Sequence, residues 1–370
     1  MNILLLNLIV NTPDNGLIPC RETNHDSMIY NMARGFVSNG HTVTIIASEE
    51  YRPHQPENNS FDVIYLPSRL PFIFKPALLP FPGGLYRHLK KNKDKYDLVI
   101  SSETFSIASL IATIALPGKV MIWQELPTHQ RLLFKLPSKI WHNLAGRVIM
   151  RNTPVVGRSL PARNFIRQYL KHVSDKIVDH GANSEIFSPN PENTHQKRFI
   201  VISQLIKRKR IDYIISQFAK FAAMPEYSDY TLDIVGKGPQ KEELQKLILS
   251  LGMTEKINLR GFLTHKELTP LSASSTGLLV YTDQDLNMVT IPESIVNGTP
   301  VLTNTVPCTT SFIDSNQLGI VKDNWGPDEL AQMAENYSAL HINCLNIRHM
   351  LTEKGCAARL VEIWTTEFAK

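Results

Sequence analysis

The chain has 370 residues, 43% hydrophobic and 20% charged, as in an ordinary globular protein long enough for two domains with separate cores. Four scattered cysteines without metal-ligand spacing argue against a zinc site or a disulfide framework, and no apolar run of about 18 residues indicates a membrane span. The net charge of +5 is modest for this size, and a reducing cytoplasm is the expected compartment.

The first half alternates short apolar runs with longer helical patterns, which is typical of stacked β-α-β units around a parallel sheet. The opening apolar run has no basic segment before it and ends at a turn, so it favours a buried strand over a signal peptide. Residues 26–38 carry one apolar stripe and end at Gly40, which indicates an amphipathic helix. The expected strands are residues 3–10, 42–47, 63–66, 98–101, 120–123, 155–157 and 176–178.

A polar, proline-rich segment at residues 188–193 indicates a linker, after which the pattern restarts. The strands expected beyond it are residues 199–204, 231–235, 257–259, 278–281 and 301–303, and the helices are residues 213–223, 240–251 and 293–297. These elements predict an α/β fold with two Rossmann-like, doubly wound domains that face a cleft and bind ligands beyond the carboxyl ends of their strands. The predicted boundaries are a first domain at 1–180, a linker at 181–197, a second domain at 198–350, and a C-terminal helix at 351–370 that packs back on the first domain.

Two carboxylates, Asp285 and Glu293, stand eight residues apart before Gly298-Thr299-Pro300 and a short apolar strand. A strand, loop and helix in this order aim backbone amides and a helix N-terminus at a ligand, where an anion is favoured. The flanking acids can accept hydroxyl groups, so the segment suits a nucleotide sugar. The alternative is a carboxylate that only caps its own helix.

A glycine turn and a basic run mark two further strand ends. Gly236-Lys237-Gly238-Pro239 follows a strand and opens a helix, which allows close approach to a ligand. Lys207-Arg208-Lys209-Arg210 places four cations in sequence, and a bound polyphosphate would relieve their repulsion. The alternative is a solvated loop. Nucleic acid fits less well, because the run is short and lacks interleaved aromatic residues.

Together these segments resemble the nucleotide-sugar domain of the retaining GT-B glycosyltransferases of family 4. The motifs that carry the resemblance are residues 178–189, Ser203-Gln204-Leu205 with Lys209, Ile234-Val235-Gly236-Lys237-Gly238-Pro239, and Asp285 to Glu293 with Gly298-Thr299-Pro300. Residues 40–43 and 96–99 fit more loosely, so the resemblance covers nearly the whole chain.

The resemblance implies a metal-independent enzyme without a cofactor, whose donor is a UDP-, GDP- or other nucleoside diphosphate sugar. Glu293 would accept the ribose hydroxyls, Asp285 would face the sugar and Lys209 would hold the diphosphate, which makes these three the expected catalytic residues. The family's usual arginine is replaced by Gln204. The other expected donor-binding residues are Gln204, Arg208, Gly236, Gly238, Met288, Val289 and Thr290.

The first half would bind the acceptor. The histidine that such enzymes often have after the fifth strand is absent, because this segment ends in Gln124-Glu125. The acceptor-side candidates are therefore Glu125, His129 in the following loop, and Asp26 where a glycine loop is usual.

Two apolar stretches with adjacent cations, residues 70–81 with 87–93 and residues 131–142, suit contact with an anionic membrane. The alternative is loops buried over the core. The predicted function is transfer of a sugar to a saccharide or lipid-linked saccharide at the inner face of the cytoplasmic membrane, in synthesis of cell-surface polysaccharide. The alternatives are an epimerase-like GT-B enzyme and a catalytically idle protein that binds sugar nucleotides.

Overall fold

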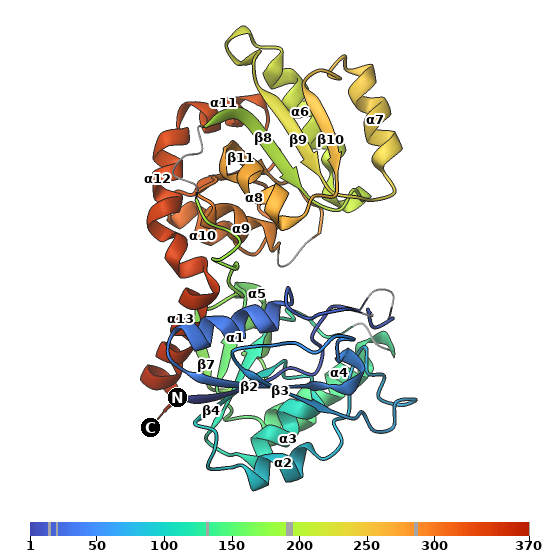
Figure 1. Ribbon diagram of the computed structural model, residues 1–370, viewed down its shortest axis with the longest axis vertical. Helices are drawn as coiled ribbons and strands as arrows, with labels where there is room; N and C mark the ends of the chain where they lie inside the picture. Colours follow the sequence, from blue (N-terminus) through green and yellow to red (C-terminus); the bar gives the residue numbers. More distant parts are fainter. Residues whose placement is uncertain (14–15, 20, 131–132, 190–194, 285–287, 370) are drawn as a thin grey trace. The chain divides into compact units, whose positions relative to one another are not determined.

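The computed structural model describes residues 1–13, 16–19, 21–130, 133–189, 195–284 and 288–369 (Figure 1). The chain forms two compact units. The first comprises Met1–Gly181 together with Glu353–Lys370, and the second comprises Ala182–Thr352. The predicted linker lies partly at residues 190–194, outside the described residues. None of the described helices is long and apolar enough to cross a membrane.

The first unit is built on a seven-stranded parallel sheet in the order β3-β2-β1-β4-β5-β6-β7. This is the doubly wound order, in which helices cover both faces and the strands are nearly continuous apolar runs. The strands are β1 (Asn2–Leu6), β2 (Thr42–Ser48), β3 (Asp62–Leu66), β4 (Leu98–Ser102), β5 (Val120–Gln124), β6 (Val155–Gly157) and β7 (Val173–Ile177).

The helices of the first unit include the last helix of the chain. Gly35 of α1 meets the start of α13, where an added Cβ would lie 2.3 Å from the Glu353 carbonyl oxygen. Cys356 and Leu360 share one buried cluster with Ile29. The C-terminal helix therefore packs on the first unit, as the sequence predicted. The helices are α1 (Met28–Ser38), α2 (Leu85–Lys91), α3 (Ile107–Ala115), α4 (Leu136–Trp141), η3 (His142–Ile149), α5 (Leu160–Ile166), α13 (Glu353–Ile363) and the short turns η1 (Glu49–Tyr51), η2 (Leu133–Lys135) and η7 (Trp364–Phe368).

The second unit repeats this strand order in a six-stranded parallel sheet, β10-β9-β8-β11-β12-β13. Its strands are β8 (Gln196–Ile202), β9 (Thr231–Val235), β10 (Ile257–Gly261), β11 (Ser275–Leu279), β12 (Val301–Thr303) and β13 (Gly319–Val321). Its helices are α6 (Ile211–Ala222), α7 (Lys241–Ser250), α8 (His265–Ala273), α9 (Thr290–Val296), α10 (Thr310–Ser315), α11 (Pro327–Glu335), α12 (Tyr337–Ile347) and the turns η4 (Lys207–Lys209), η5 (Pro225–Tyr227) and η6 (Arg348–Leu351).

The predicted fold class, two Rossmann-like α/β domains, is confirmed, with local corrections. β1 ends at Leu6 rather than at residue 10, and Asn7 turns the chain by donating its side-chain amide to the Ile9 carbonyl at 3.0 Å. β7 begins at Val173 and β11 at Ser275, both three residues earlier than expected, and β13 was not predicted. The β1 correction matters most, because residues 7–13 become a loop that lines a cavity.

Candidate functional site

In the second unit, the glycine turn after β9 is required by its own backbone packing. Gly236 has a φ of +146°, and a Cβ there would lie 1.8 Å from the Ser203 carbonyl oxygen. A Cβ at Gly238 would lie 2.3 Å from the Leu205 carbonyl oxygen. The Leu205 amide also donates to the Lys237 carbonyl at 3.0 Å. The two glycines therefore let the chain after β9 pack against the chain after β8. Close approach of a ligand, for which the sequence predicts these glycines, is not the one need that they meet.

The basic turn η4 is tied to the segment that follows β11. The Arg208 carbonyl accepts hydrogen bonds from the Thr282 hydroxyl at 3.0 Å and the Asp283 amide at 2.8 Å. The Arg208 side chain donates to the Gln284 carbonyl, while Lys209 is half-buried. These bonds bring Arg208, a predicted phosphate-binding cation, beside the chain that leads to Asp285. Asp285 itself lies outside the described residues.

Arg210 differs from the other cations of the run. Its guanidinium lies 3.3 Å from Asp283 and 3.5 Å from Asp212, and 6.0 Å from the centre of the Tyr281 ring. The protein itself therefore compensates the charge of Arg210, and a bound polyphosphate is not needed to offset the charge of this residue.

Helix α9 is buried except at Thr290 and Glu293. Every other residue from Ile291 to Pro300 is buried, whereas the Glu293 side chain is partly exposed. Met288 packs into the core, so only its backbone can serve a ligand. The hydroxyl of Thr290, at the start of the helix, is buried and has no hydrogen-bond partner among the described residues. The fold thus presents one carboxylate from a helix that is otherwise buried beyond its first residue, and a carboxylate is a good acceptor for hydroxyl groups.

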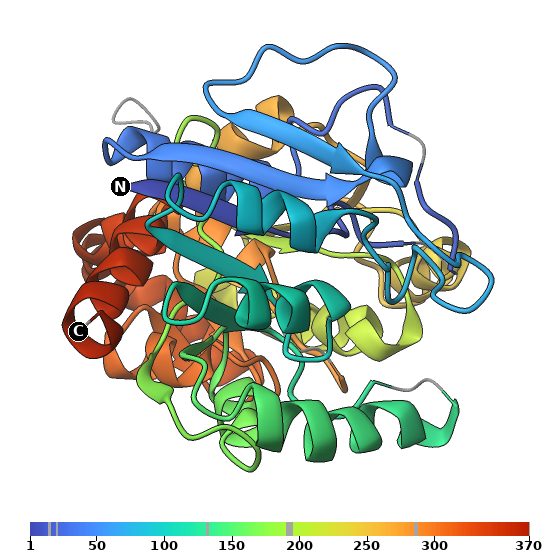
Figure 2. The same cartoon turned by 90° about the horizontal axis from the view of Figure 1, so that it is seen from below.

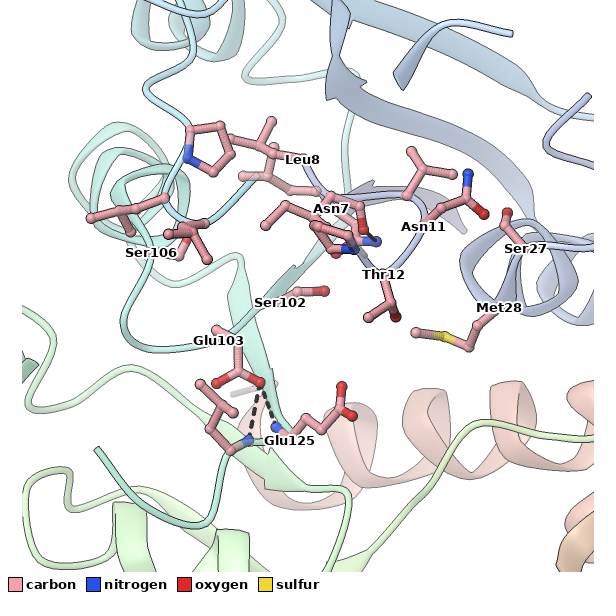
Figure 3. Close-up of a pocket in the computed structure, with 18 of the residues that line it drawn as sticks. Asn7, Leu8, Asn11, Thr12, Ser27, Met28, Ser102, Glu103, Ser106 and Glu125 are labelled. Atoms are coloured by element: carbon pink, nitrogen blue, oxygen red, sulfur yellow. Dashed lines mark hydrogen bonds between the residues drawn. The ribbon is translucent and has the colours of Figure 1, made fainter. Parts of the chain in front are cut away.

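The first unit contains a cavity of about 510 Å³ at the carboxyl ends of its strands (Figure 3). It is lined by the loop after β1, by the start of α1, and by the ends of β4 and β5. The polar side chains around it include Asn7, Asn11, Asp26, Glu103, Glu125 and Arg158. The structure therefore brings two of the predicted acceptor-side residues, Asp26 and Glu125, into the lining of one cavity.

Glu103, at the end of β4, is held rigidly in this cavity. One carboxylate oxygen accepts hydrogen bonds from the backbone amides of Glu125 at 2.7 Å and Leu126 at 3.3 Å (Figure 3). The other oxygen accepts a hydrogen bond from the side-chain amide of Gln124 at 2.7 Å. Its φ of +66° is uncommon for a residue other than glycine and stores strain of the kind found at functional sites. Removal from bulk water, with a smaller effect of the Glu125 carboxylate, raises the pKa of Glu103 to about 7.

Glu125 is fixed by a buried arginine. Its carboxylate lies 2.7 Å from the Arg158 guanidinium, which stacks 3.8 Å from the centre of the Trp123 ring. Half of the Glu125 side chain remains exposed, whereas Arg158 is almost fully buried. The ion pair therefore fixes the orientation of the Glu125 carboxylate, which stays accessible from the cavity.

His129 does not line this cavity. Its two ring nitrogens lie 3.1 Å from the Ser138 hydroxyl and 3.0 Å from the Tyr169 hydroxyl. The ring packs edge-on against His142 and Phe165, and burial, together with nearby lysines, lowers its pKa. The structure thus places His129 among these side chains and not in the lining of the cavity, and its acceptor role stays a prediction.

Two family models match the two units. The model described as Glycosyl transferases group 1 matches residues 182–355, and the model described as Glycosyltransferase Family 4 matches residues 26–150. The chain is a GT-B glycosyltransferase of the group 1, family 4 type. The fold likeness agrees: the structure of HepE from Anabaena in complex with UDP superposes with a TM-score of 0.65 at 14% identity, over 99% of this chain and 100% of that one.

Curated relatives of this glycosyltransferase are distant. An uncharacterized glycosyltransferase of Haemophilus influenzae is 20% identical over 348 residues, which cover 90% of this chain and 93% of the relative. An exopolysaccharide phosphotransferase of Streptomyces coelicolor is 25% identical over 211 residues, 56% of this chain. The matched region spans only 21% of that relative's length.

Two residues of this glycosyltransferase's cavity, Glu103 and Arg158, were not predicted from the sequence. Each follows a β-strand directly, which places both at the carboxyl edge of the sheet. That position was the available signal for Glu103, since it comes immediately after an apolar strand. Among the residues that the structure describes, no group of three or more His, Cys, Asp or Glu side chains is arranged to hold a metal ion.

Proposed function

We propose that this glycosyltransferase is retaining and metal-independent, and that it moves a sugar from a nucleoside diphosphate sugar to a saccharide or lipid-linked saccharide acceptor. The observation that carries the donor assignment is the accessible Glu293 on buried α9, in the same unit as the anchored Arg208 and half-buried Lys209. A carboxylate for hydroxyls and cations for phosphates are the groups that a nucleotide sugar needs. The UDP in the HepE complex supports the same donor class.

The reaction would proceed as follows. Glu293 accepts the ribose hydroxyls, Asp285 faces the sugar, and Lys209 with Arg208 holds the diphosphate. The bond between the anomeric carbon and the phosphate oxygen breaks, and the acceptor oxygen bonds to that carbon on the same face. The departing phosphate oxygen takes the acceptor's proton, so no strong base is needed. Cationic side chains stabilise the charge that develops on the diphosphate.

The acceptor would occupy the cavity of the first unit. Glu103, Glu125 and Asp26 offer carboxylate oxygens, and Asn7 and Asn11 offer amides, which suits the many hydroxyls of a saccharide. Because the pKa of Glu103 is about 7, this residue changes from donor to acceptor of a hydrogen bond near neutral pH. In either form it can hydrogen-bond a hydroxyl group of a saccharide. The exopolysaccharide-related name of the Streptomyces coelicolor relative supports a place in cell-surface polysaccharide synthesis.

An apolar loop beside the cavity supports work at the inner face of the cytoplasmic membrane. Phe72 and Ile73 are 95% and 72% exposed, so this part of the loop is not core, although Phe74 packs on Phe81. The same loop continues into Leu79, which lines the cavity. The cations predicted to accompany it, including Lys90, are exposed. A lipid-linked acceptor would leave its lipid in the membrane and present its head group to the cavity.

The decisive experiment combines donor binding and product analysis. A thermal-shift panel of UDP, GDP, ADP and their sugars identifies the nucleotide, since a ligand at 100 times its Kd stabilises by about 2.7 kcal/mol. With that donor and candidate saccharides, release of the nucleoside diphosphate and a retained anomeric configuration by NMR are expected. Binding without release contradicts the proposal in favour of an idle sugar-nucleotide protein, and an isomerised free sugar nucleotide contradicts it in favour of an epimerase.

A further inference from the structure

Helix α4 continues directly into the π-helix η3 and forms one rod, residues 136–149, along the lower edge of Figure 2. Its outward side carries large apolar residues at every fourth position. Leu136, Ile140, Leu144 and Val148 are 58%, 50%, 63% and 73% exposed. Since a π-helix is wound more loosely than an α-helix, residues four apart stay nearly in line along η3. The rod therefore presents a continuous apolar row to solvent.

The opposite side of the rod already packs against the first unit. Ser138, His142 and Ala145 are buried, and His142 packs with His129, Phe165 and Tyr169. The exposed row is therefore an additional surface that the fold does not use for its core. An apolar hollow of about 400 Å³ runs along it, and its lining residues are Leu136, Pro137, Ile140, Trp141, Leu144 and Ala145.

The rod belongs to a segment of one charge sign. Residues 126–174 contain nine Lys or Arg and no Asp or Glu, in a chain that has 34 acidic residues in total. Lys135, Lys139 and Arg151, at the ends and along the flank of the rod, are all exposed. Cations beside an apolar row complement the two layers of an anionic bilayer surface, phosphate groups above and acyl chains below.

The rod is also continuous with the acceptor cavity. Trp141 of the rod packs edge-on against Phe105 at 5.6 Å, and its indole nitrogen donates to the Thr104 carbonyl at 2.8 Å. Phe105 in turn lines the cavity. A surface bound along the rod would therefore lie next to the place where the acceptor is proposed to bind.

We propose that the rod is a membrane-docking surface for a bilayer that contains anionic lipid. Leu136, Ile140, Leu144 and Val148 enter the boundary between head groups and acyl chains, and Lys135, Lys139 and Arg151 contact lipid phosphates. This proposal depends on the proposed function in one respect: docking would bring a lipid-borne acceptor to the cavity. It concerns a different surface from the loop that contains Phe72.

The test is flotation of the full chain with vesicles, in the absence of donor and acceptor. Binding is expected to vesicles of mixed phosphatidylcholine and phosphatidylglycerol but not to phosphatidylcholine alone, and to weaken as salt rises. A basic side chain at an anionic surface contributes about a fivefold change in affinity. The triple variant K135Q/K139Q/R151Q should therefore bind about 100-fold more weakly. The matched control K220Q/K241Q/K246Q removes three exposed cations from the second unit and should retain wild-type binding.

A second variant tests the apolar row. L144S/V148S changes two well-exposed side chains, so the fold should keep its thermal midpoint while vesicle affinity falls about tenfold or more. Vesicle binding that survives both rod variants and is lost in F72S/I73S would overturn the rod assignment and leave the loop as the membrane contact. Equal binding to neutral vesicles, or self-association that L144S/V148S abolishes without any vesicle binding, would also overturn it. Glycosyl transfer to a soluble acceptor is measured separately and can succeed or fail independently.

Discussion

The two units share a strand order and differ in the charge that they place at the carboxyl edge of the sheet. In the second unit the chain after β8 carries the cations Lys207, Arg208 and Lys209, with one accessible carboxylate on α9. In the first unit the charged residues that line the cavity are three carboxylates, Asp26, Glu103 and Glu125, and two arginines, Arg21 and Arg158. One scaffold can thus serve a diphosphate at one sheet and hydroxyl groups at another, because function depends on the side chains grafted at strand ends.

The difference extends to how the polar groups are held. Arg208 and the glycine turn are fixed by backbone contacts between neighbouring loops. Glu103 and Glu125 are fixed by side-chain and amide bonds within the cavity wall. Substitutions in the second unit should therefore weaken binding of a charged donor strongly, whereas substitutions in the first unit should change pH dependence and acceptor affinity.

The largest effect is expected from loss of the diphosphate cation. Lys209→Met removes the charge that we propose stabilises the leaving group, and loss of one preorganised group of this kind costs about 100- to 1,000-fold in turnover. The matched control is Lys207→Met, an exposed neighbour on the same turn, which should stay within a few-fold of wild type. Steady-state kinetics of nucleotide release measure both. Equal losses in the two variants would mean that the run acts only through its total charge.

Glu293→Gln should have the next largest effect, because the charged group that we propose accepts the ribose hydroxyls becomes a weaker neutral acceptor. A hydrogen bond to a charged group is worth about 1.5–3 kcal/mol, which corresponds to a loss of roughly 10- to 150-fold in donor affinity. Calorimetry with the nucleoside diphosphate measures it directly. The assignment of Glu293 fails if affinity and turnover both stay within twofold.

The sequence predicts those elements that depend on residues close together in the chain, and it fails where the structure depends on residues far apart. β6, β9 and β12 were predicted with their observed bounds, because a short apolar run between turns becomes a buried strand in almost any α/β fold. β1 was predicted too long, since Leu8 and Val10 are apolar and buried although they lie in a loop. Periodicity cannot separate a buried loop from a buried strand.

The candidate site divides in the same way. The residues predicted for the donor side lie in short motifs with fixed spacing, so Lys209 and Glu293 could be proposed from the sequence alone. The acceptor cavity is assembled from β1, β4, β5 and β6, and the positions of Glu103 and Arg158 depend on which strands are neighbours. The packing role of His129 likewise depends on Tyr169 and Ser138, which no local pattern reveals.

Glu103→Gln should alter the pH profile of transfer more than its maximum. If the ionised carboxylate accepts an acceptor hydroxyl, kcat/KM of the wild type rises with pH through about 7, the pKa of Glu103. The variant should lose this rising limb and, at pH 8, fall about tenfold. The measurement is kcat/KM of both proteins from about pH 5.5 to 9, a range that spans the ionisation of the Glu103 carboxyl. If kcat/KM of the variant still rises with pH in the same way, the rise comes from the ionisation of another residue.

The Glu103 carboxyl should lower the free energy of unfolding as pH rises. The pKa of Glu103 is raised in the folded protein, so its favourable contribution is complete below the ordinary carboxylate pKa and is lost as pH rises through about 7. Denaturant unfolding at pH 5 and pH 8 should show a larger loss of stability in the wild type than in Glu103→Gln. The effect is moderate because the side chain is only partly buried. An equal pH dependence in both proteins would contradict the shifted pKa.

The smallest expected effect is that of chelation, which tests whether side-chain cations alone serve the leaving group. Asp283-Gln284-Asp285 places two acids after β11 with a spacing that can hold a divalent ion. Asp283, however, already lies 3.3 Å from the Arg210 guanidinium, so its charge is compensated within the protein. Turnover in EDTA should therefore stay within about twofold of the untreated enzyme, in line with stabilisation by fixed cations. A complete loss of turnover in EDTA that manganese or magnesium restores would show that a metal ion binds the diphosphate. The charge difference between the two units would then not explain how the leaving group is stabilised.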